Sequence, residues 1–141
     1  MYTRVRFKGS TLEADTSIKF GLTQTTDVLD SSPQSTGISL HSAYQTLKLY
    51  NADGLVKTYD TGRWNNDGKY HDVWIRLFRD TGNVYIKIDD GGWDFNYAIA
   101  STTGDYRAWA GAYHSHGNAG EVRWDCIHID ETPLKSGATV T

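Results

Sequence analysis

Two kinds of side chain that bind sugars recur at alternating positions in the second half of this chain. Flat aromatic rings pack against the C–H surface of a pyranose, while polar groups hydrogen-bond its hydroxyls. If the segments that carry these side chains belong to one sheet, they line a single water-facing groove for a polysaccharide or another glycan. The candidates are Trp74, Arg76, Tyr85, Lys87, Trp109 and Tyr113. The alternative is that the aromatic members cover the back of a sheet or fill a second core.

The loops add three candidates. Trp64 and Trp93 lie in segments rich in Gly and Asp, and a loop Trp is costly to expose unless it packs or binds something. Packing over the end of the domain is the other explanation for both. His114 forms a His-x-His pair with His116, which could bind a transition metal weakly. Because the following loop contains neither a carboxylate nor a Cys, a solvated loop is the simpler interpretation.

Carboxylates suited to catalysis are scarce. Cleavage of a glycosidic bond normally requires two carboxylates, about 5 to 5.5 Å apart when the anomeric configuration is retained. Glu13, Glu121 and Glu131 are the only glutamates. Glu121 and Asp125 lie four residues apart on one predicted strand, with a suspected irregularity between them. We therefore expect a non-catalytic module, with a small glycan hydrolase as a lesser alternative.

A hairpin predicted over residues 70–93 positions four of the candidates. Its strands alternate in polarity, and Asp80-Thr81-Gly82-Asn83 supplies the turn. One face is apolar and carries Val73, Ile75, Leu77, Val84, Ile86 and Ile88. The other face carries Trp74, Arg76, Phe78, Tyr85, Lys87 and Asp89. That second face is too aromatic for a plain wet surface and too polar for a core, so we expect it to bind a ligand.

Short alternating strands run along most of the chain, and no window of more than ten residues shows helical periodicity. Strands are expected at 2–8, 18–23, 38–42, 45–50, 55–60, 70–79, 83–90, 95–99, 107–113 and 121–130. This pattern predicts an all-β jelly-roll sandwich of two antiparallel sheets. Residues 1–130 are expected to form a single domain, and residues 131–141 a C-terminal tail or linker.

Composition excludes several classes of protein. Hydrophobic residues make up 38% of the 141 residues, enough for one core in a chain of single-domain length. A net charge of −3 with scattered basic residues argues against a nucleic-acid partner. Membrane insertion is not expected, because no apolar run approaches the roughly 18 residues of a membrane span. Cys126 is the only cysteine, which excludes an internal disulfide and a zinc site built on paired cysteines.

The last predicted strand breaks its own alternation. Trp124 has the parity of one face, whereas Ile127 and Ile129 have the parity of the other. Because a shift of one residue moves every later side chain to the opposite face, a β-bulge is predicted near Asp125-Cys126. The alternative is a continuous strand buried on both faces.

The order of several segments resembles the concanavalin A-like lectin/glucanase superfamily, which includes laminin G-like domains. The segments are Phe20-Gly21-Leu22, Gly37-Ile38-Ser39-Leu40, residues 70–76, residues 84–92, Ala110-Gly111-Ala112-Tyr113 and residues 121–129. They fall within residues 18–130, and the specificity lies in their order. The resemblance implies a jelly roll with one sheet curved into a concave face, where such domains often bind sugars, as they do at the loop rim.

The resemblance also implies a metal. Many such sandwiches carry one structural calcium, and an Asp in a Trp-Asp-x-Ile setting of the last strand often supplies a ligand. Asp125 matches that position, with Glu13 or Asp15 as a candidate partner, since calcium takes several oxygen ligands. The alternative is that Asp125 only hydrogen-bonds across the sandwich. Some lyases of the superfamily use His and Tyr as acid and base, which leaves His114 beside Tyr113 as a lesser catalytic alternative.

Together these features predict a non-catalytic, lectin-like module that binds a glycan on an aromatic-lined sheet face or a loop rim. We expect an extracellular or cell-surface location, fused to or assembled with a larger protein, with Met1 an added start on a fragment. The main alternative is an interaction domain, such as a laminin G-like adhesion module or a phage or virion appendage domain. Its aromatic face would then be a protein interface.

Overall fold

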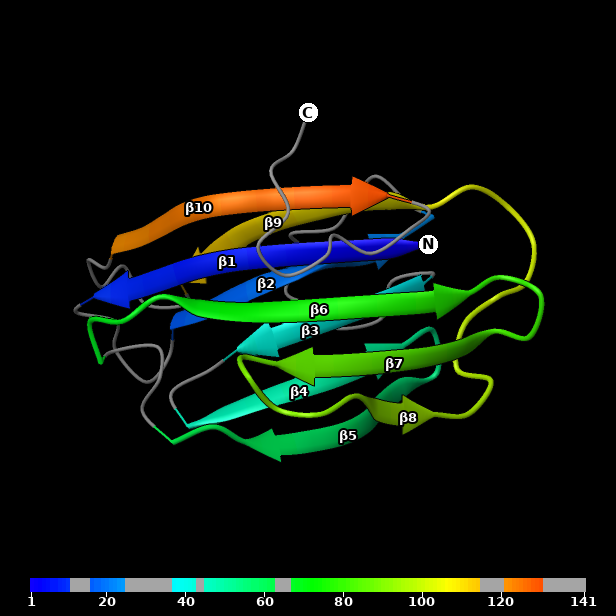
Figure 1. Cartoon of the computed structure of the whole chain (residues 1–141), viewed down its shortest axis with the longest axis horizontal. Coiled ribbons are helices and arrows are strands. Elements are labelled where there is room, and N and C mark those ends of the chain that lie inside the picture. Colours follow the sequence, from blue (N-terminus) through cyan, green and yellow to red (C-terminus); the bar gives the residue numbers. More distant parts are fainter. Residues whose placement is uncertain (11–15, 25–36, 43–44, 63–66, 115–120, 131–141) are drawn as a thin grey trace.

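The described residues form ten strands in two antiparallel sheets of five strands each, as a computed structural model of the chain shows (Figure 1). The structure describes the backbone of residues 1–10, 16–24, 37–42, 45–62, 67–114 and 121–130. It describes the side chains of residues 1–6, 18–24, 37–42, 45–62 and 67–111. The predicted all-β fold of two antiparallel sheets is confirmed.

Each sheet combines strands that are far apart in sequence. Sheet A consists of β1 (Tyr2–Ser10), β6 (His71–Phe78), β7 (Asn83–Ile88), β8 (Asp94–Asn96) and β10 (Glu121–Asp130), in the order β10-β1-β6-β7-β8. Sheet B consists of β2 (Thr16–Thr23), β3 (Gly37–Ser42), β4 (Thr46–Asn51), β5 (Gly54–Asp60) and β9 (Arg107–His114), in the order β5-β4-β3-β2-β9. Figure 1 shows sheet A in front of sheet B. In the described part of the chain, no helix is long and apolar enough to cross a bilayer.

The core lies between the sheets and follows the alternation of the strands. Sheet A contributes Val5, Val73, Ile75, Leu77, Val84 and Ile86, and sheet B contributes Ile18, Phe20, Leu22, Ile38, Leu40, Leu47 and Leu49. All are at most 1% exposed, so their apolar area supplies the main driving force for folding. Because side chains alternate along a strand, the intervening residues form two outer faces on opposite sides of the sandwich.

The predicted β-bulge in the last strand is confirmed. Arg6 pairs with Cys126, and the next residue of β1, Phe7, pairs with Trp124. Asp125 therefore has no partner in this ladder, which is the two-against-one arrangement of a bulge. The bulge is what allows Trp124 and Ile127 to keep opposite parities within one continuous strand.

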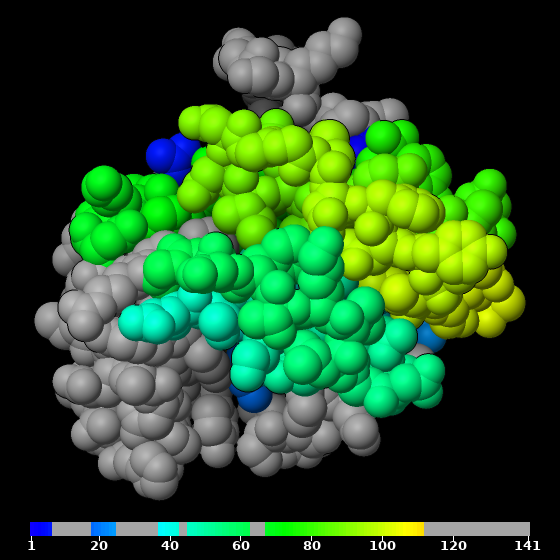
Figure 2. All heavy atoms as spheres, turned by 90° about the horizontal axis from the view of Figure 1, so that it is seen from below, coloured from blue at the N-terminus to red at the C-terminus, as the bar shows by residue number. Residues whose placement is uncertain are grey.

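A polar cluster joins the two sheets at the edge formed by β5 and β8. Lys57 Nζ and Tyr59 Oη each donate a hydrogen bond of 2.6 Å to Asp94 Oδ2, and Asn96 Nδ2 donates one of 3.3 Å to Tyr59 Oη. Burial raises the pKa of Asp94, but the bonds from Lys57 and Tyr59 outweigh it and hold that pKa below its ordinary value. Figure 2 looks at this edge from below, where β5 and the β7–β8 region meet.

The expectation that the three aromatic strands share one sheet is wrong. β6 and β7 lie in sheet A, whereas β9 is the edge strand of sheet B and pairs with β2. In that pairing Ala108 lies opposite Leu22, and Ala110 lies opposite Phe20. The small residues of β9 thus accommodate large core side chains of β2. Parity separates the two faces of a strand, but it does not say which distant strand becomes its neighbour.

Candidate functional site

The outer face of sheet A brings together four of the predicted binding residues. Cross-strand pairing places them in two rows that alternate cationic and aromatic side chains. One row is Arg4, Trp74 and Lys87, and the other is Tyr2, Arg76, Tyr85 and Phe95. Most of these side chains are half-buried, and Phe95 is 48% exposed. Trp93, another predicted residue, immediately precedes β8 and is 41% exposed.

The outer face of sheet B holds a different set of residues. One cross-strand row is Trp109, Gly21, Ser39 and Tyr50, and the adjacent row is Gly111, Lys19, His41 and Lys48. Trp109 and Tyr50 stand three strand spacings apart, roughly 14 Å, with a glycine and a serine between them. The small residues are shielded, since Ser39 is 2% exposed, whereas Trp109, Tyr50, His41 and Lys48 are half-buried. Trp109 therefore lies on the opposite side of the sandwich from Trp74.

His41 is held neutral on this face. Burial lowers its pKa most, and the charges of Lys19 and Lys48 on the flanking strands lower it further, to about 4. Its ring packs against the ring of Tyr50, with centroids 4.6 Å apart. A neutral imidazole has one donor and one acceptor nitrogen, which is the combination that a hydroxyl group complements.

Trp109 carries an unsatisfied donor. Its indole Nε1 is buried and has no hydrogen-bond partner within the described part of the chain. Buried polar groups are nearly always paired, so an orphan of this kind commonly marks the place of a water or ligand atom. The face of sheet B thus combines two aromatic walls, a neutral imidazole, an amine and an unused N–H group.

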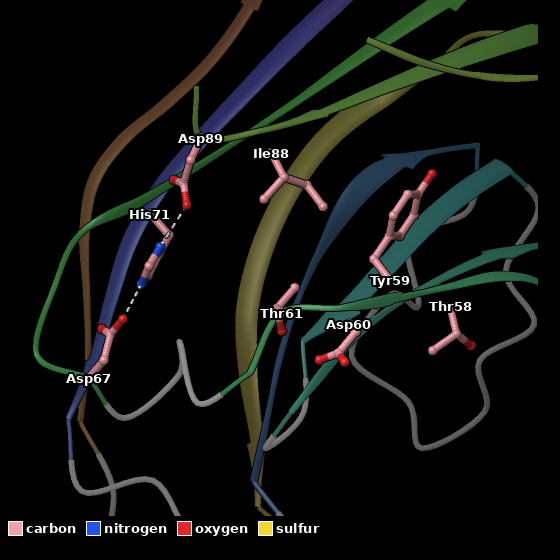
Figure 3. Close-up of a pocket in the computed structure, with 8 residues that line it drawn as sticks. All are labelled: Thr58, Tyr59, Asp60, Thr61, Asp67, His71, Ile88 and Asp89. Carbon is pink, nitrogen blue, oxygen red and sulfur yellow. Dashed lines mark hydrogen bonds and ion pairs between the residues drawn. The ribbon is translucent and has the colours of Figure 1, made fainter. Parts of the chain in front are cut away.

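A pocket of about 590 Å³ opens at the end of β5, next to the start of β6 and the end of β7 (Figure 3). It is lined by Thr58, Tyr59, Asp60, Thr61, Asp67, His71, Ile88 and Asp89. In Figure 3, His71 lies between Asp67 and Asp89, across the pocket from Tyr59 and Thr58. Its Nδ1 is 2.9 Å from Asp89 Oδ2, and its Nε2 is 2.9 Å from Asp67 Oδ2.

These bonds make His71 a clamp between two loops. Asp89 has a φ of +49°, a left-handed conformation that Asp adopts more readily than most residues. Its second carboxylate oxygen accepts a hydrogen bond of 2.8 Å from the backbone N–H of Asp72. Since both ring nitrogens of His71 are engaged, its side chain fixes the turn after β7 to the segment before β6.

Replacing this clamp is expected to destabilise the fold. His71→Ala removes the contacts of both ring nitrogens with carboxylates from a buried position and should lower the free energy of unfolding by about 2 kcal/mol. Urea denaturation at neutral pH measures the change. Lys69→Ala, an exposed position on the same segment, is the control and should change stability by less than about 0.5 kcal/mol. Equal effects of the two substitutions would contradict the clamp.

Several predicted site residues lie outside the described side chains. Trp64 and Glu13 are outside the described residues altogether, and only the backbone of Tyr113 and His114 in β9 is described. Asp125 occupies the bulge of β10, again without a described side chain. Among the described residues, no group of three or more His, Cys, Asp or Glu could hold a metal. The calcium site on Asp125 and Glu13 stays a prediction, which a calcium-dependent rise in melting temperature would support.

Comparison with known proteins identifies the fold. No family model matches the chain, and no curated protein sequence matches it. Three solved congerin structures are similar, each alignment covering 92% of this chain and 90% of the other. They are a congerin II double mutant (TM-score 0.56, 10% identity), lactose- and MES-liganded congerin II (0.54, 12%) and ancestral congerin Con-anc (0.53, 14%). The chain therefore shares the β-sandwich fold of these congerin structures.

Alternating apolar and polar residues along β3 and β4 also indicate the outward residues of the sheet B face. Ile38 and Leu40 alternate with Ser39 and His41 along β3. Leu47 and Leu49 alternate with Lys48 and Tyr50 along β4. This alternation, like that of the hairpin at residues 70–93, places the outward residues of each strand on one face. Their contact across β3 and β4 becomes apparent only once the register of the two strands is known.

Proposed function

We propose that this protein is a lectin-like module that binds a neutral glycan on the outer face of sheet B. The observation that carries the proposal is the arrangement of Trp109 and Tyr50 on either side of Gly21 and Ser39, with neutral His41 beside Tyr50. Aromatic rings on both sides of small residues offer stacking surfaces for a sugar ring. The imidazole and the amine of Lys48 offer hydrogen bonds to its hydroxyls.

The fold supports the same function. One similar structure, congerin II, is described as lactose-liganded, so a sandwich of this shape can present a surface that holds a sugar. At 12% identity, the likeness extends to the fold and not to individual binding residues. The assignment of residues therefore rests on the chemistry of the sheet B face in this chain.

The test of this proposal is to remove the aromatic ring of Tyr50. Tyr50→Ala should weaken binding of a neutral glycan by about twofold to about tenfold, because stacking on an aromatic ring contributes roughly 0.5 to 1.5 kcal/mol, and loss of the contact with His41 favours the upper end. The measurement is a glycan array that includes lactose, followed by titration calorimetry on the best binder. Tyr97→Ala is the matched control, since Tyr97 is 77% exposed and lies next to β8 in sheet A.

Two outcomes would refute the proposal. One is a folded wild-type protein that binds no neutral glycan on a broad array. The other is a pair of variants, Tyr50→Ala and Trp109→Phe, that both bind as well as the wild type does. Thermal melting of each variant checks that a loss of binding is not a loss of fold.

A further inference from the structure

The outer face of sheet A has the composition of a second binding surface. It lies on the opposite side of the sandwich from the sheet B face, so it does not belong to the site proposed above. Its two rows cross β1, β6, β7 and β8 and place a cation next to a ring along each row. One row alternates cation, ring and cation over three strands, and the other sets Arg76 between Tyr2 and Tyr85.

The cations on this face differ in how they are paired. Arg4 is neutralised, because its Nε and Nη2 lie 3.0 and 2.9 Å from Asp72 Oδ1. Arg76 and Lys87 have no carboxylate partner among the described residues. The guanidinium of Arg76 instead lies 4.2 Å from the ring centroid of Phe78 and 5.0 Å from that of Tyr2.

This arrangement leaves two positive charges available to a ligand. A guanidinium held by aromatic rings keeps N–H donors for a carboxylate or sulfate group, which it binds in a fixed, often bidentate geometry. The ammonium of Lys87 is one row away, on the neighbouring strand. An occupant with repeated negative charges would therefore meet charge complementarity at two adjacent points.

The aromatic side chains add a strip of mutually tilted rings beside these charges. The ring of Tyr85 lies 5.5 Å from that of Phe78 and 5.0 Å from that of Phe95, and Phe95 in turn lies 6.3 Å from Tyr97. This strip extends from β6 to the exposed edge at β8. It offers apolar ring edges and faces to a polymer that lies across the strands.

We propose that the sheet A face binds an acidic polysaccharide, whose carboxylate or sulfate groups pair with Arg76 and Lys87 while its sugar rings pack on Trp74, Tyr85 and Phe95. Single-stranded nucleic acid also combines negative charge with stacking groups, but its binders rely on a strongly basic groove. This chain has a net charge of −3, and of the cations in the two rows only Arg76 and Lys87 lack a carboxylate partner among the described residues. The acidic polysaccharide is the better match.

The experiment compares four polymers on the folded full-length chain by affinity electrophoresis and calorimetry. Polygalacturonate presents carboxylates, dextran sulfate presents sulfates, dextran is neutral, and oligo(dT) is a nucleic acid. Binding to at least one of the two acidic polysaccharides is expected, with affinity that falls as salt is raised, and no binding to dextran at this face. Preference between the two acidic polymers identifies the anionic group.

Substitutions locate the binding. The double variant Arg76→Gln/Lys87→Gln should weaken acidic polysaccharide binding by about tenfold or more, since charge-assisted hydrogen bonds contribute the most among polar contacts. The control Lys69→Gln/Arg107→Gln removes the same charge from exposed positions off this face and should stay within about twofold of the wild type. Lys87→Gln alone serves if the double variant does not fold.

The variants distinguish the sheet A site from the sheet B site. Tyr50→Ala should leave acidic polysaccharide binding unchanged, and the Arg76/Lys87 double variant should leave neutral glycan binding unchanged. The inference is overturned if the folded protein binds neither acidic polymer, if both double variants lose affinity equally, or if oligo(dT) binds more tightly than either polysaccharide.

Discussion

Lowering the pH from about 7 to about 4 is expected to remove about 3 kcal/mol of folding stability through His41 alone. An ordinary histidine has a pKa of 6.5, and burial together with Lys19 and Lys48 lowers the pKa of His41 to about 4 in the folded protein. Between these two values the unfolded chain binds a proton that the folded chain does not. The free energy of unfolding therefore falls as the pH falls through this window and levels off below it.

The measurement is urea denaturation at several pH values between 7 and 4, for the wild type and for His41→Gln. Glutamine keeps a planar hydrogen-bonding group but does not titrate, so the difference between the two stability curves isolates His41. The titration of Asp94 contributes little to the stability change between pH 7 and 4. Its pKa is lowered in the folded protein, so stability is lost through Asp94 only as the pH falls toward and below its ordinary value of 3.8. Parallel curves for the two proteins would contradict the lowered pKa.

The same titration bears on binding. The neutral imidazole is what allows His41 to accept a hydrogen bond from a sugar hydroxyl as well as to donate one. Above about pH 5 the charge of His41 is constant, so glycan affinity on the sheet B face should change little between pH 5.5 and 8. A histidine with an unperturbed pKa would change its charge within that range.

Local patterns in the sequence predicted the elements well, for physical reasons that can be traced. The alternation of Val73, Ile75 and Leu77 with polar and aromatic residues determined both the strand and its buried face. The change of parity between Trp124 and Ile127 identified the bulge at Asp125. Both signals depend only on which side of a strand each residue occupies, and a single sequence contains that information.

The pairing of strands that are far apart in the chain could not be predicted from such local patterns. The assignment of β9 to sheet B depends on Leu22 and Phe20 fitting against Ala108 and Ala110, which are separated from them by more than eighty residues. The clamp at His71 depends on a turn that brings Asp89 back to the start of β6. Such contacts follow from the whole topology and not from spacing along the chain.

The separation of the predicted groove into two faces changes its chemistry. A single groove would have joined the rows of Arg76 and Lys87 to Trp109, which lies on the other sheet. In the structure, Arg76 and Lys87 lie on one side, and neutral His41 and Tyr50 lie on the other. Both faces carry cations, but on sheet A they stand beside a strip of aromatic rings, whereas on sheet B Lys19 and Lys48 flank a neutral imidazole. This difference is why the acidic and the neutral glycan are assigned to separate surfaces.

Gly21→Ala is expected to destabilise the protein by about 3 kcal/mol or more, although alanine is ordinarily the better strand residue by roughly 0.5 to 1 kcal/mol. A Cβ at Gly21 would lie 2.1 Å from the backbone oxygen of Ile38 and 3.0 Å from Cα of Ser39. Backbone atoms cannot rotate away as a side chain can, so β2 and β3 must move apart. That movement would disturb the packing of Phe20 and Leu40 beneath and the position of Ser39 between Trp109 and Tyr50.

Gly92→Ala is the matched control for this prediction. An added Cβ at Gly92 meets no atom within 4 Å, so the substitution should change stability by less than about 0.5 kcal/mol. Urea denaturation of both variants gives the comparison, and the glycan titration gives a second readout. A Gly21→Ala protein as stable as the wild type would show that β2 and β3 are not paired in this register. In that case the cross-strand rows that define the sheet B face would be misplaced, and the neutral-glycan site would have to be sought elsewhere on the sandwich.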